Sequence, residues 1–417
     1  MISDNAKYWI WLTQTLGYNQ PKIEKLYRLY PNIADFYQGG EKEWRLSGVL
    51  NSNDLKKLDS ADINVSKPIL QQCDSYGYSV ISIDDDFYPD KLRHIYAPPA
   101  VLYVQGKTNI FDDRLVIAIV GTRTASSYGT TNAYRFAYAF GKCDVATVSG
   151  GALGVDCAAH RGSLAAHGVT ICVRGCGINY NYLPDNARMR QAITNDGAVI
   201  SEYPPDTEPR PHHFPARNRI IAGLCDGLIL MESGKKSGSL ITANLALEMG
   251  KEVFALLGNN SPRNMGSNDR IKEGTAYPVT DFMDVLAAFE KRSIKRSAVD
   301  FDDICLADIE AIPVKRGRAV KKQQNNNDLD DIKPTPPVFP QKEEPKEPQK
   351  TVPVHKKDVD LTEVQQKVYD YLSDKPVHID AISKNLNIPV FKVLGSLTVL
   401  EIKGLAQAHP GRNFSLK

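Results

Sequence analysis

Basic side chains, an aromatic ring and an amide lie close together in the segment RPHHFPARNR, residues 210–219. Cations can hold a phosphate backbone, and a flat ring can stack on an unpaired base at about 1–3 kcal/mol per base. The same residues also fit ordinary packing, with the ring in a core and the arginines paired with carboxylates. Arg219 suits this second interpretation best, because Ile220 and Ile221 beside it must be buried. The candidates for ligand contact are Arg210, His212, Phe214, Arg217 and Asn218.

Three glycine-containing loops offer further anion sites, each directly after an apolar run. Glycine lets the backbone approach a ligand closely, and the N–H groups at a helix start bind anions. An arginine adds a fork of donors that matches phosphate. Tight packing between strand and helix is the alternative use of these glycines. The candidate residues are Gly121, Thr122 and Arg123 in the first loop, Gly150 and Gly151 in the second, and Lys235, Lys236, Ser237 and Gly238 in the third.

The spacing of these glycines excludes two common cofactor sites. The loops match neither the dinucleotide pattern G-x-G-x-x-G nor the triphosphate pattern G-x-x-x-x-G-K-[ST], so no cofactor is expected. No metal-type cluster is evident, and the seven cysteines are scattered and odd in number, which favours reduced thiols. Asp156 and His160, four residues apart on an expected helix, are the one tempting acid–base pair. A hydrogen bond that holds the glycine turn is the preferred interpretation, and no catalytic residue is predicted.

The elements that must position these loops alternate between strands and helices from about 110 to 290. Nearly continuous apolar runs predict buried parallel strands, and strand–helix alternation predicts a doubly wound, Rossmann-like α/β fold. Ligands of such folds lie at the carboxyl ends of the strands, so the loops should converge on one edge. The strands are expected at 115–121, 145–151, 169–175, 197–203, 227–233 and 252–258, and the helices at 129–141, 154–167, 186–195, 214–223 and 239–249.

The flanking regions differ in composition from this α/β region. Residues 1–90 show helical spacing of apolar residues and predict a small helical domain, followed by the Rossmann-like domain at 91–290. Residues 291–357 are rich in Pro, Gln, Asn and charge and predict a disordered linker. Residues 358–417 predict three helices and a β-ribbon, the order of a winged helix. The third of these helices carries few basic residues, so contact with protein is at least as good an interpretation as contact with DNA.

The whole-chain composition excludes few functions. The formal net charge of +2 indicates no particular partner, and 42% of the residues are hydrophobic. No run approaches the roughly 20 apolar residues of a membrane helix. The N-terminus does not have the pattern of a signal peptide. A cytoplasmic protein without a membrane partner is expected.

Five motifs occur in the order known from one family, and the chain resembles the DprA/Smf DNA-processing proteins over about 85–290. The segment 88–106 also resembles the start of that family's core region. The resemblance is specific, because several separate motifs keep their order. The motifs are GTRTASSYG (121–129), SGGALGVDCAAHRG (149–162), SEYPP (201–205), FPARNRIIAGL (214–224) and SGSLITANLALEMGKEVFALLGN (237–259).

The resemblance implies a non-catalytic protein that binds and protects single-stranded DNA. It further implies a homodimer formed through the Rossmann-like domain, and delivery of incoming strands to the RecA recombinase during natural transformation. The Gly-Thr-Arg loop and the phenylalanine would contact DNA, together with a basic residue just before Phe214. Arg210 is the candidate for that residue, because Pro211 and His212 stand where a lysine or arginine is expected.

One alternative enzyme class shares a related fold. A nucleotide phosphoribohydrolase would carry a Pro-Gly-Gly-x-Gly-Thr loop with a glutamate shortly after it. Here Ser239 and Leu240 interrupt that pattern, so the binding protein is the preferred hypothesis.

Overall fold

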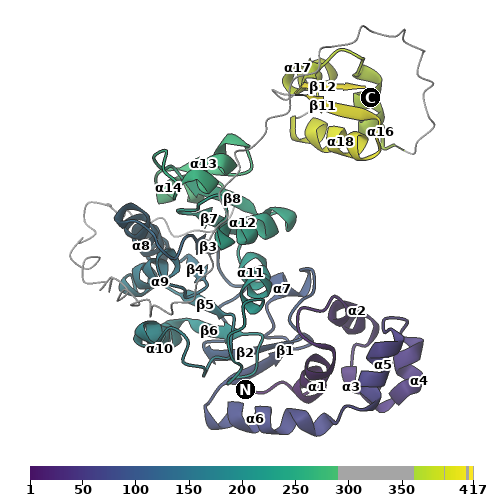
Figure 1. Cartoon of the computed structure of the whole chain (residues 1–417), viewed down its shortest axis with the longest axis vertical. Coiled ribbons are helices and arrows are strands. Elements are labelled where there is room, and N and C mark those ends of the chain that lie inside the picture. Colours follow the sequence, from purple (N-terminus) through teal and green to yellow (C-terminus); the bar gives the residue numbers. More distant parts are fainter. Residues whose placement is uncertain (290–360, 389, 410–412, 417) are drawn as a thin grey trace, which may run out of the picture. The chain divides into compact units, whose positions relative to one another are not determined.

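The protein is described from a computed structural model of the 417-residue chain. The structure describes residues 1–289, 361–388, 390–409 and 413–416. These residues form two compact units, one before and one after the segment 290–360 of the chain (Figure 1). The linker predicted at 291–357, and Cys305 within it, therefore lie outside the described residues.

The first 75 residues fold into short helices around large aromatic side chains. Trp9, Trp11 and Phe36 are buried almost completely, and Trp44 closes the same cluster. Burial of such rings supplies most of the driving force for a small helical region. The helices are α1 (Ala6–Leu16), α2 (Lys22–Leu29), α3 (Ile33–Gln38), α4 (Gly40–Leu46), α5 (Ser52–Asp59) and α6 (Ser66–Ser75), with a 3₁₀ turn, η1 (Ile63–Val65), before α6.

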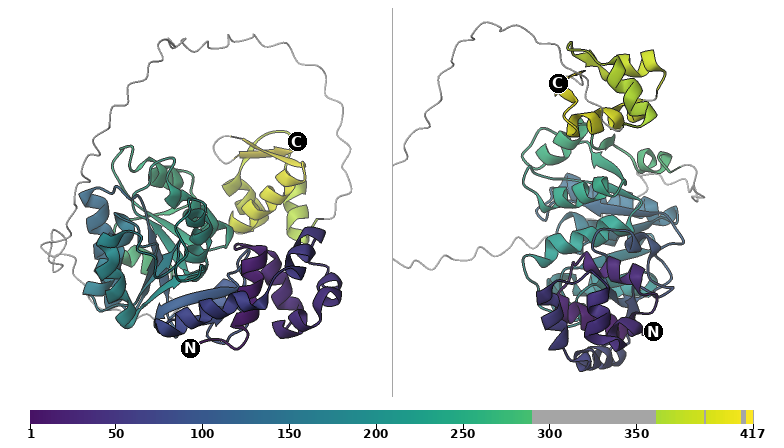
Figure 2. Two further views of the ribbon diagram at one scale, coloured as in Figure 1. Left: turned by 60° about the horizontal axis from the view of Figure 1, so that its bottom comes forward. Right: turned by 90° about the vertical axis from the view of Figure 1, so that its right-hand side faces the viewer.

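A strand follows these helices where the sequence predicted none. β1 (Ser79–Ser82) pairs antiparallel with β2 (Val101–Gly106) and joins the central sheet. Val80 and Ile81 are both buried, so this short strand shows no alternation that would separate it from a helix. Helices α1 and α6 pack against it (Figure 2). The expectation of a purely helical segment up to residue 90 is therefore wrong, and the domain boundary placed there stays a prediction.

The central sheet contains nine strands in the described part of the chain, in the order β1-β2-β6-β5-β4-β3-β7-β8-β9. The strands from β6 to β9 in this order are parallel, while β2 and β1 are antiparallel additions at one edge. The doubly wound α/β fold is thus confirmed. The further strands are β3 (Val116–Val120), β4 (Ala146–Ser149), β5 (Thr170–Arg174), β6 (Ala198–Ser201), β7 (Gly227–Leu230), β8 (Glu252–Leu256) and β9 (Tyr277–Val279).

Helices cover both faces of this sheet, as Figures 1 and 2 show. Along β3, Ile117 and Ile119 face the cluster under α8, while Val116, Ala118 and Val120 face the cluster that includes α11 and α12. Both faces of the strand are buried, which explains its continuous apolar run. The helices are α7 (Asp90–Arg93), α8 (Ser127–Lys142), α9 (Val155–Ala165), α10 (Ala187–Asp196), α11 (His213–Leu224), α12 (Gly238–Glu248), α13 (Met265–Lys272) and α14 (Phe282–Ala287), with a second 3₁₀ turn, η2 (Pro184–Asn186).

The strand order reverses between β3 and β7. The chain runs from β3 outward to β6 and then returns to place β7 on the other side of β3. At such a switch point the loops that follow two neighbouring strands diverge and leave a crevice at their carboxyl ends, where ligands bind. The loop at Gly121 follows β3 and the loop at Glu232 follows β7, so both border this crevice.

The second unit has the predicted order of helices and ribbon. A capping box at Thr362 starts its first helix. The elements are α16 (Glu363–Tyr371), β10 (Val377–His378), α17 (Ile379–Leu386), α18 (Val390–Ile402), β11 (Ala406–His409) and β12 (Asn413–Leu416). The strand β10 was not predicted, and it extends the ribbon to three strands in the order β10-β12-β11.

Candidate functional site

The Gly-Thr-Arg loop is held in place by Glu232, which lies just beyond the end of β7. The backbone N–H of Thr122 donates to the backbone oxygen of Glu232 over 2.8 Å. The side chain of Glu232 accepts from the N–H of Ser126 over 2.8 Å and from its hydroxyl over 2.5 Å. Ser126 in turn caps α8 by accepting from Gly129. Glu232 is buried. Its positioning role could not be predicted from the sequence, because a single glutamate after a strand forms no motif.

Glycine is required where the first and second loops touch. Gly154 has φ +77°, and a Cβ there would lie 2.5 Å from the carbonyl oxygen of Thr122 and 2.7 Å from that of Arg123. Such contacts are too short for any side chain, and the positive φ also favours glycine. The close approach lets the N–H of Val155 reach the oxygen of Thr122 at 3.3 Å. Gly154 therefore allows the first loop to pack against the start of α9.

Asp156 and Arg217 hold the second loop through hydrogen bonds to its backbone. The carboxylate of Asp156 accepts from the backbone N–H groups of Gly150 at 3.2 Å and Ala152 at 3.3 Å. Arg217 donates to the carbonyl oxygen of Gly150 at 2.8 Å and also to that of Val173. A Cβ on Gly150 would lie 2.5 Å from the Arg217 guanidinium. The aspartate thus makes the loop-holding hydrogen bonds preferred on sequence grounds.

Burial shifts the pKa values of both Asp156 and Arg217. It raises the pKa of Asp156, while the nearby charge of Arg217 and the backbone donors oppose the rise. It also lowers the pKa of Arg217, and Asp156 opposes that change. Arg217 is only 6% exposed, so most of its guanidinium is already committed to the backbone. Arg217 was predicted to contact a ligand, and its hydrogen bonds place it mainly in the scaffold of the site.

Arg123 and Phe214 form the open part of the site. The guanidinium carbon of Arg123 lies 5.5 Å from the centre of the Phe214 ring, within the range of a cation–π contact. The Phe214 ring is half-buried and packs against Tyr182 at 5.4 Å between ring centres. Gly175 lies under it, because a Cβ there would meet the ring at 2.9 Å. The Arg123 side chain is exposed and makes no hydrogen bond or ion pair within the described residues, so its donors are available to a ligand.

These residues line a cavity of about 410 Å³, here called the Arg123 cavity. Its volume lies in the usual range for ligand sites. The expected convergence of loops at the carboxyl ends of the strands is thus observed for the Gly-Thr-Arg loop, for Phe214, Arg217 and Asn218, and for the start of α12. The second loop reaches this cavity through Ala152, while Gly150 and Gly151 line a smaller pocket that Arg123 and Phe214 also border. The lining includes Gly121, Thr122, Arg123, Asp156, Phe214, Arg217, Asn218, Ser237 and Gly238.

The two lysines of the third loop lie elsewhere. Lys235 and Lys236 are exposed and do not line the Arg123 cavity. The ammonium of Lys235 is 3.6 Å from a carboxylate oxygen of Asp269. Ser237 caps α12 by accepting from the N–H of Ser239, so the helix start faces the cavity while the lysines extend from the preceding turn.

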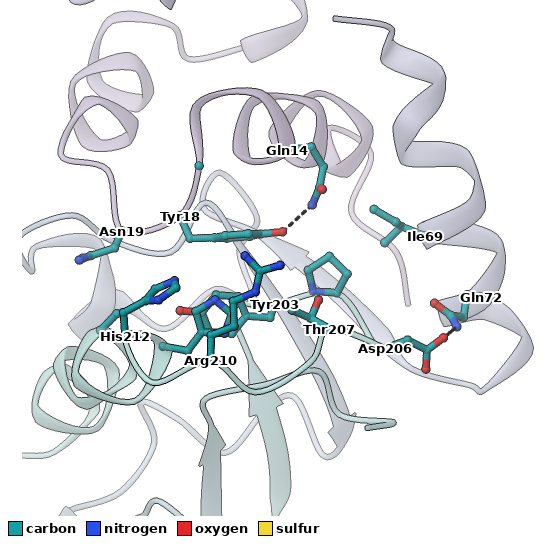
Figure 3. A pocket seen from close by; sticks show the side chains of 14 residues that line it. Gln14, Tyr18, Asn19, Ile69, Gln72, Tyr203, Asp206, Thr207, Arg210 and His212 are labelled. Carbon is teal, nitrogen blue, oxygen red and sulfur yellow. Dashed lines mark hydrogen bonds between the residues drawn. The ribbon is translucent and has the colours of Figure 1, made fainter. Parts of the chain in front are cut away.

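The cations before Phe214 face a different cavity. Arg210 and His212 line a cavity of about 750 Å³, here called the Tyr18 cavity, on the side of the loop after α1 (Figure 3). The sequence grouped them with Phe214 in one patch, but α11 begins at His213, and its first turn points successive side chains in different directions.

Arg219 makes the carboxylate pair that was the alternative interpretation. Its guanidinium lies 2.6 Å from Glu202, and the two side chains are 5% and 2% exposed. It also donates to the side chain of Asn19 at 2.7 Å. This cluster joins the loop after α1 to the end of β6 and the middle of α11. No sequence pattern links residues about 200 positions apart, so it could not have been predicted.

His160 is part of the packing between α9 and β5. It is fully buried, and its Nδ1 lies 2.7 Å from the hydroxyl of Thr170. Burial, helped by the charge of Arg217, lowers the pKa of His160 to about 3, so the ring is neutral at physiological pH. Asp156 and His160 therefore contact different groups and do not form a pair.

In the part of the chain that the structure describes, no group of three or more His, Cys, Asp or Glu side chains could hold a metal ion. None of the helices in this part is long and apolar enough to cross a membrane.

Two protein-family models match this chain, one over the α/β region and one over the C-terminal region. A family described as DNA recombination-mediator protein A matches residues 79–290, and one described as DprA winged helix domain matches 352–412. The chain is 42% identical over 210 residues to DNA processing protein DprA of Streptococcus pneumoniae, covering 50% of this chain and 73% of the relative. It is 27% identical over 427 residues to Protein Smf of Synechocystis, covering 99% of each.

A solved structure agrees with these matches. The X-ray structure of DprA from Streptococcus pneumoniae aligns with a TM-score of 0.60 and 35% sequence identity, covering 67% of this chain and 97% of that one. The α/β region and the winged-helix region thus both match models of one family. The chain belongs to the DprA/Smf family of DNA-processing proteins.

Proposed function

We propose that this DNA-processing protein binds single-stranded DNA at the Arg123 cavity and carries out no bond-breaking chemistry of its own. The observation that carries the proposal is the Arg123–Phe214 pair, an unpaired cation 5.5 Å from a half-buried ring. A cation for the backbone beside a ring for a base is what a single-strand site requires. The helix starts and glycine loops around the pair add backbone donors for phosphate.

A comparison of single-stranded and double-stranded oligonucleotides tests this function. We expect the single strand to bind more tightly, because only an unpaired base can leave its neighbours and stack on Phe214. Affinity for both should fall as salt rises, because phosphate contacts release counterions. Equal affinity for the two forms at every salt concentration would contradict the proposal. Release of a free base from nucleoside monophosphates would instead favour the phosphoribohydrolase alternative.

The protection of bound strands and their delivery to the RecA recombinase in natural transformation belong to the same proposal. The description of the matching family as a recombination mediator supports it. The buried cysteine thiols of the described residues are typical of a reducing compartment, which supports a cytoplasmic location. Assembly of RecA on bound single strands, with and without this protein, tests the delivery step.

We also infer a homodimer formed through the α/β unit. Tyr277 on β9 is 60% exposed, and Leu257 and Met283 next to this strand are 43% and 42% exposed. Tyr128 lies beside them, since its hydroxyl donates to the backbone oxygen of Leu257 at 2.7 Å. β9 is also an end strand of the sheet in the described residues. Exposed apolar side chains along such an edge favour association.

Sedimentation of the wild-type chain and of Met283→Glu tests this dimer. We expect the wild type to sediment at twice the 46.2 kDa of one chain and the variant to sediment as a monomer. The added carboxylate would have to be buried without a partner in the dimer. A variant that stays dimeric would place the interface elsewhere.

A further inference from the structure

The Tyr18 cavity joins the N-terminal helices to the segment that carries Phe214. The loop after α1 and helix α6 form one wall, and the stretch from Tyr203 to the first turn of α11 forms the other (Figure 3). At about 750 Å³ it is larger than the Arg123 cavity. Its lining is rich in rings and amides and includes Gln14, Tyr18, Asn19, Gln72, Tyr203, Arg210, His212 and His213.

A row of rings crosses this cavity from one wall to the other. The Tyr18 and Tyr203 ring centres are 4.9 Å apart. Tyr203 stacks on His213 at 4.1 Å, and His213 meets His212 edge-on at 4.6 Å. The next residue, Phe214, lines the Arg123 cavity. One turn of chain, 212–214, therefore borders both cavities and connects their aromatic surfaces.

The charges around the cavity suit a phosphate chain. Arg210 is exposed, its side chain extends toward the Tyr18 ring in Figure 3, and the described residues offer it no hydrogen bond or ion pair. The carboxylate of Asp206 already accepts from the side-chain amides of Gln72 and Asn179. Burial raises the pKa of Tyr18, so its hydroxyl stays neutral. A free cation thus lies beside a neutral ring, as Arg123 lies beside Phe214.

The polar groups around Tyr18 can read the edge of a base. Gln14 donates to the Tyr18 hydroxyl at 2.5 Å, and the side-chain oxygen of Asn19 accepts from Arg219 at 2.7 Å. Both residues are exposed at the cavity wall, so their remaining amide groups can meet a ligand. Side-chain amides carry both donors and acceptors, and unpaired bases are recognised by stacking together with hydrogen bonds at their edges. A cavity of this volume can hold one such base with its sugar and phosphate.

We propose that the Tyr18 cavity is a second subsite for the same single strand, in which a base stacks on Tyr18 and Arg210 holds the adjoining phosphate. The proposal rests on the proposed function, because the strand reaches this subsite from the Arg123 cavity across residues 212–214. It assigns the N-terminal helices a direct part in binding. It also gives Arg210 and Phe214, which face different cavities, a common ligand.

Affinity measurements with two strand lengths test the subsite on the full chain. Oligo-dT of roughly 4 and roughly 16 nucleotides spans the usual range of single-strand site sizes. Tyr18→Leu removes the ring and keeps an apolar side chain, while Tyr18→Phe keeps the ring and removes only the hydroxyl. We expect Tyr18→Leu to weaken binding of the longer strand about 5- to 100-fold and to leave the shorter strand within about 2-fold. Tyr18→Phe should stay within about 2-fold for both.

Three outcomes separate this subsite from the proposed function. If Tyr18→Leu equals Tyr18→Phe at both lengths while Arg123→Ala loses affinity, the subsite is wrong and the function stands. If Tyr18→Leu weakens both lengths equally, the ring acts on the fold and the subsite is also wrong. If the wild-type chain binds neither length, the function itself fails.

A crosslinking experiment on the wild-type chain needs no variant that could misfold. Oligo-dT with 5-iodouracil at single positions is irradiated, and the crosslinked peptides are identified. A crosslink to the peptide that contains Tyr18, from a position several nucleotides away from the one that reaches Phe214, supports the subsite. Crosslinks confined to peptides that line the Arg123 cavity would overturn it.

Discussion

Replacement of Arg123 with alanine is expected to weaken binding to oligo-dT by about 1–3 kcal/mol and to reduce the salt slope by about one phosphate contact. The guanidinium has no hydrogen bond or ion pair among the residues that the structure describes, so its donors are free for a phosphate. Its removal also exposes one face of the Phe214 ring. A gel shift or fluorescence anisotropy titration at several salt concentrations measures both effects.

Because the Arg123 side chain makes no hydrogen bond or ion pair among the described residues, Arg123→Ala should remain as stable as the wild type. A substitution at an exposed position without such contacts usually changes the free energy of unfolding by less than about 0.5 kcal/mol. Lys107→Ala is a matched control for the lost charge. Lys107 is exposed and follows β2, and its N–H donates to Gly197 just before β6 begins, at the opposite edge of the sheet. Loss of affinity in Lys107→Ala equal to that in Arg123→Ala would show a general charge effect and no specific site.

The second large effect is expected on stability, from Arg219→Met. This change leaves Glu202, whose side chain is 2% exposed, as a buried charge without its cation. Breaking a buried ion pair from one side costs about 3–5 kcal/mol. The variant also loses the hydrogen bond from Arg219 to Asn19, so the loop after α1 should be held less tightly against α11. Urea unfolding of the variant and the wild type measures the loss.

Two further variants test whether the expected loss of stability comes from the burial of the Arg219–Glu202 pair. Arg28 and Glu24 are also 2.6 Å apart, but their side chains are 66% and 24% exposed, so Arg28→Ala should cost less than about 1 kcal/mol. The double variant Arg219→Met with Glu202→Leu should recover much of the loss, because it removes both charges together. If Arg219→Met is no more destabilising than Arg28→Ala, the Arg219–Glu202 pair contributes little to stability. Apolar contacts would then hold the loop after α1 against α11.

The sequence alone determined the alternation of strands and helices in the α/β unit. Each predicted strand was an apolar run because parallel strands are buried on both faces, and this local property needs no knowledge of neighbours. The strands ended earlier than predicted at the glycines: β4 ends at Ser149, and Gly150 and Gly151 already belong to the loop. β1 was missed because four residues buried on both faces show no periodicity.

The sequence also identified the loops of the candidate site, and only the tertiary structure decided what each side chain does there. In the sequence, Arg123 and Arg217 are both basic residues of candidate binding segments. Arg123 lies at a loop surface, whereas Arg217 lies on the face of α11 that packs against β5 and donates to backbone oxygens. Whether an arginine serves a ligand or the scaffold depends on which groups the fold brings within 3 Å, and chain neighbours do not contain that information.

Contacts between distant segments also explain why the roles of Glu232 and Tyr18 could not be predicted from the sequence. Glu232 holds the loop after β3 only because the order of strands places β7 next to β3. Tyr18 meets Tyr203 only because the N-terminal helices pack against that end of the sheet. A motif records residues that are close along the chain, so the sequence determined the fold class and the glycine loops. The division of the basic residues between two cavities was decided by contacts between segments up to 200 residues apart, such as Arg219 with Asn19.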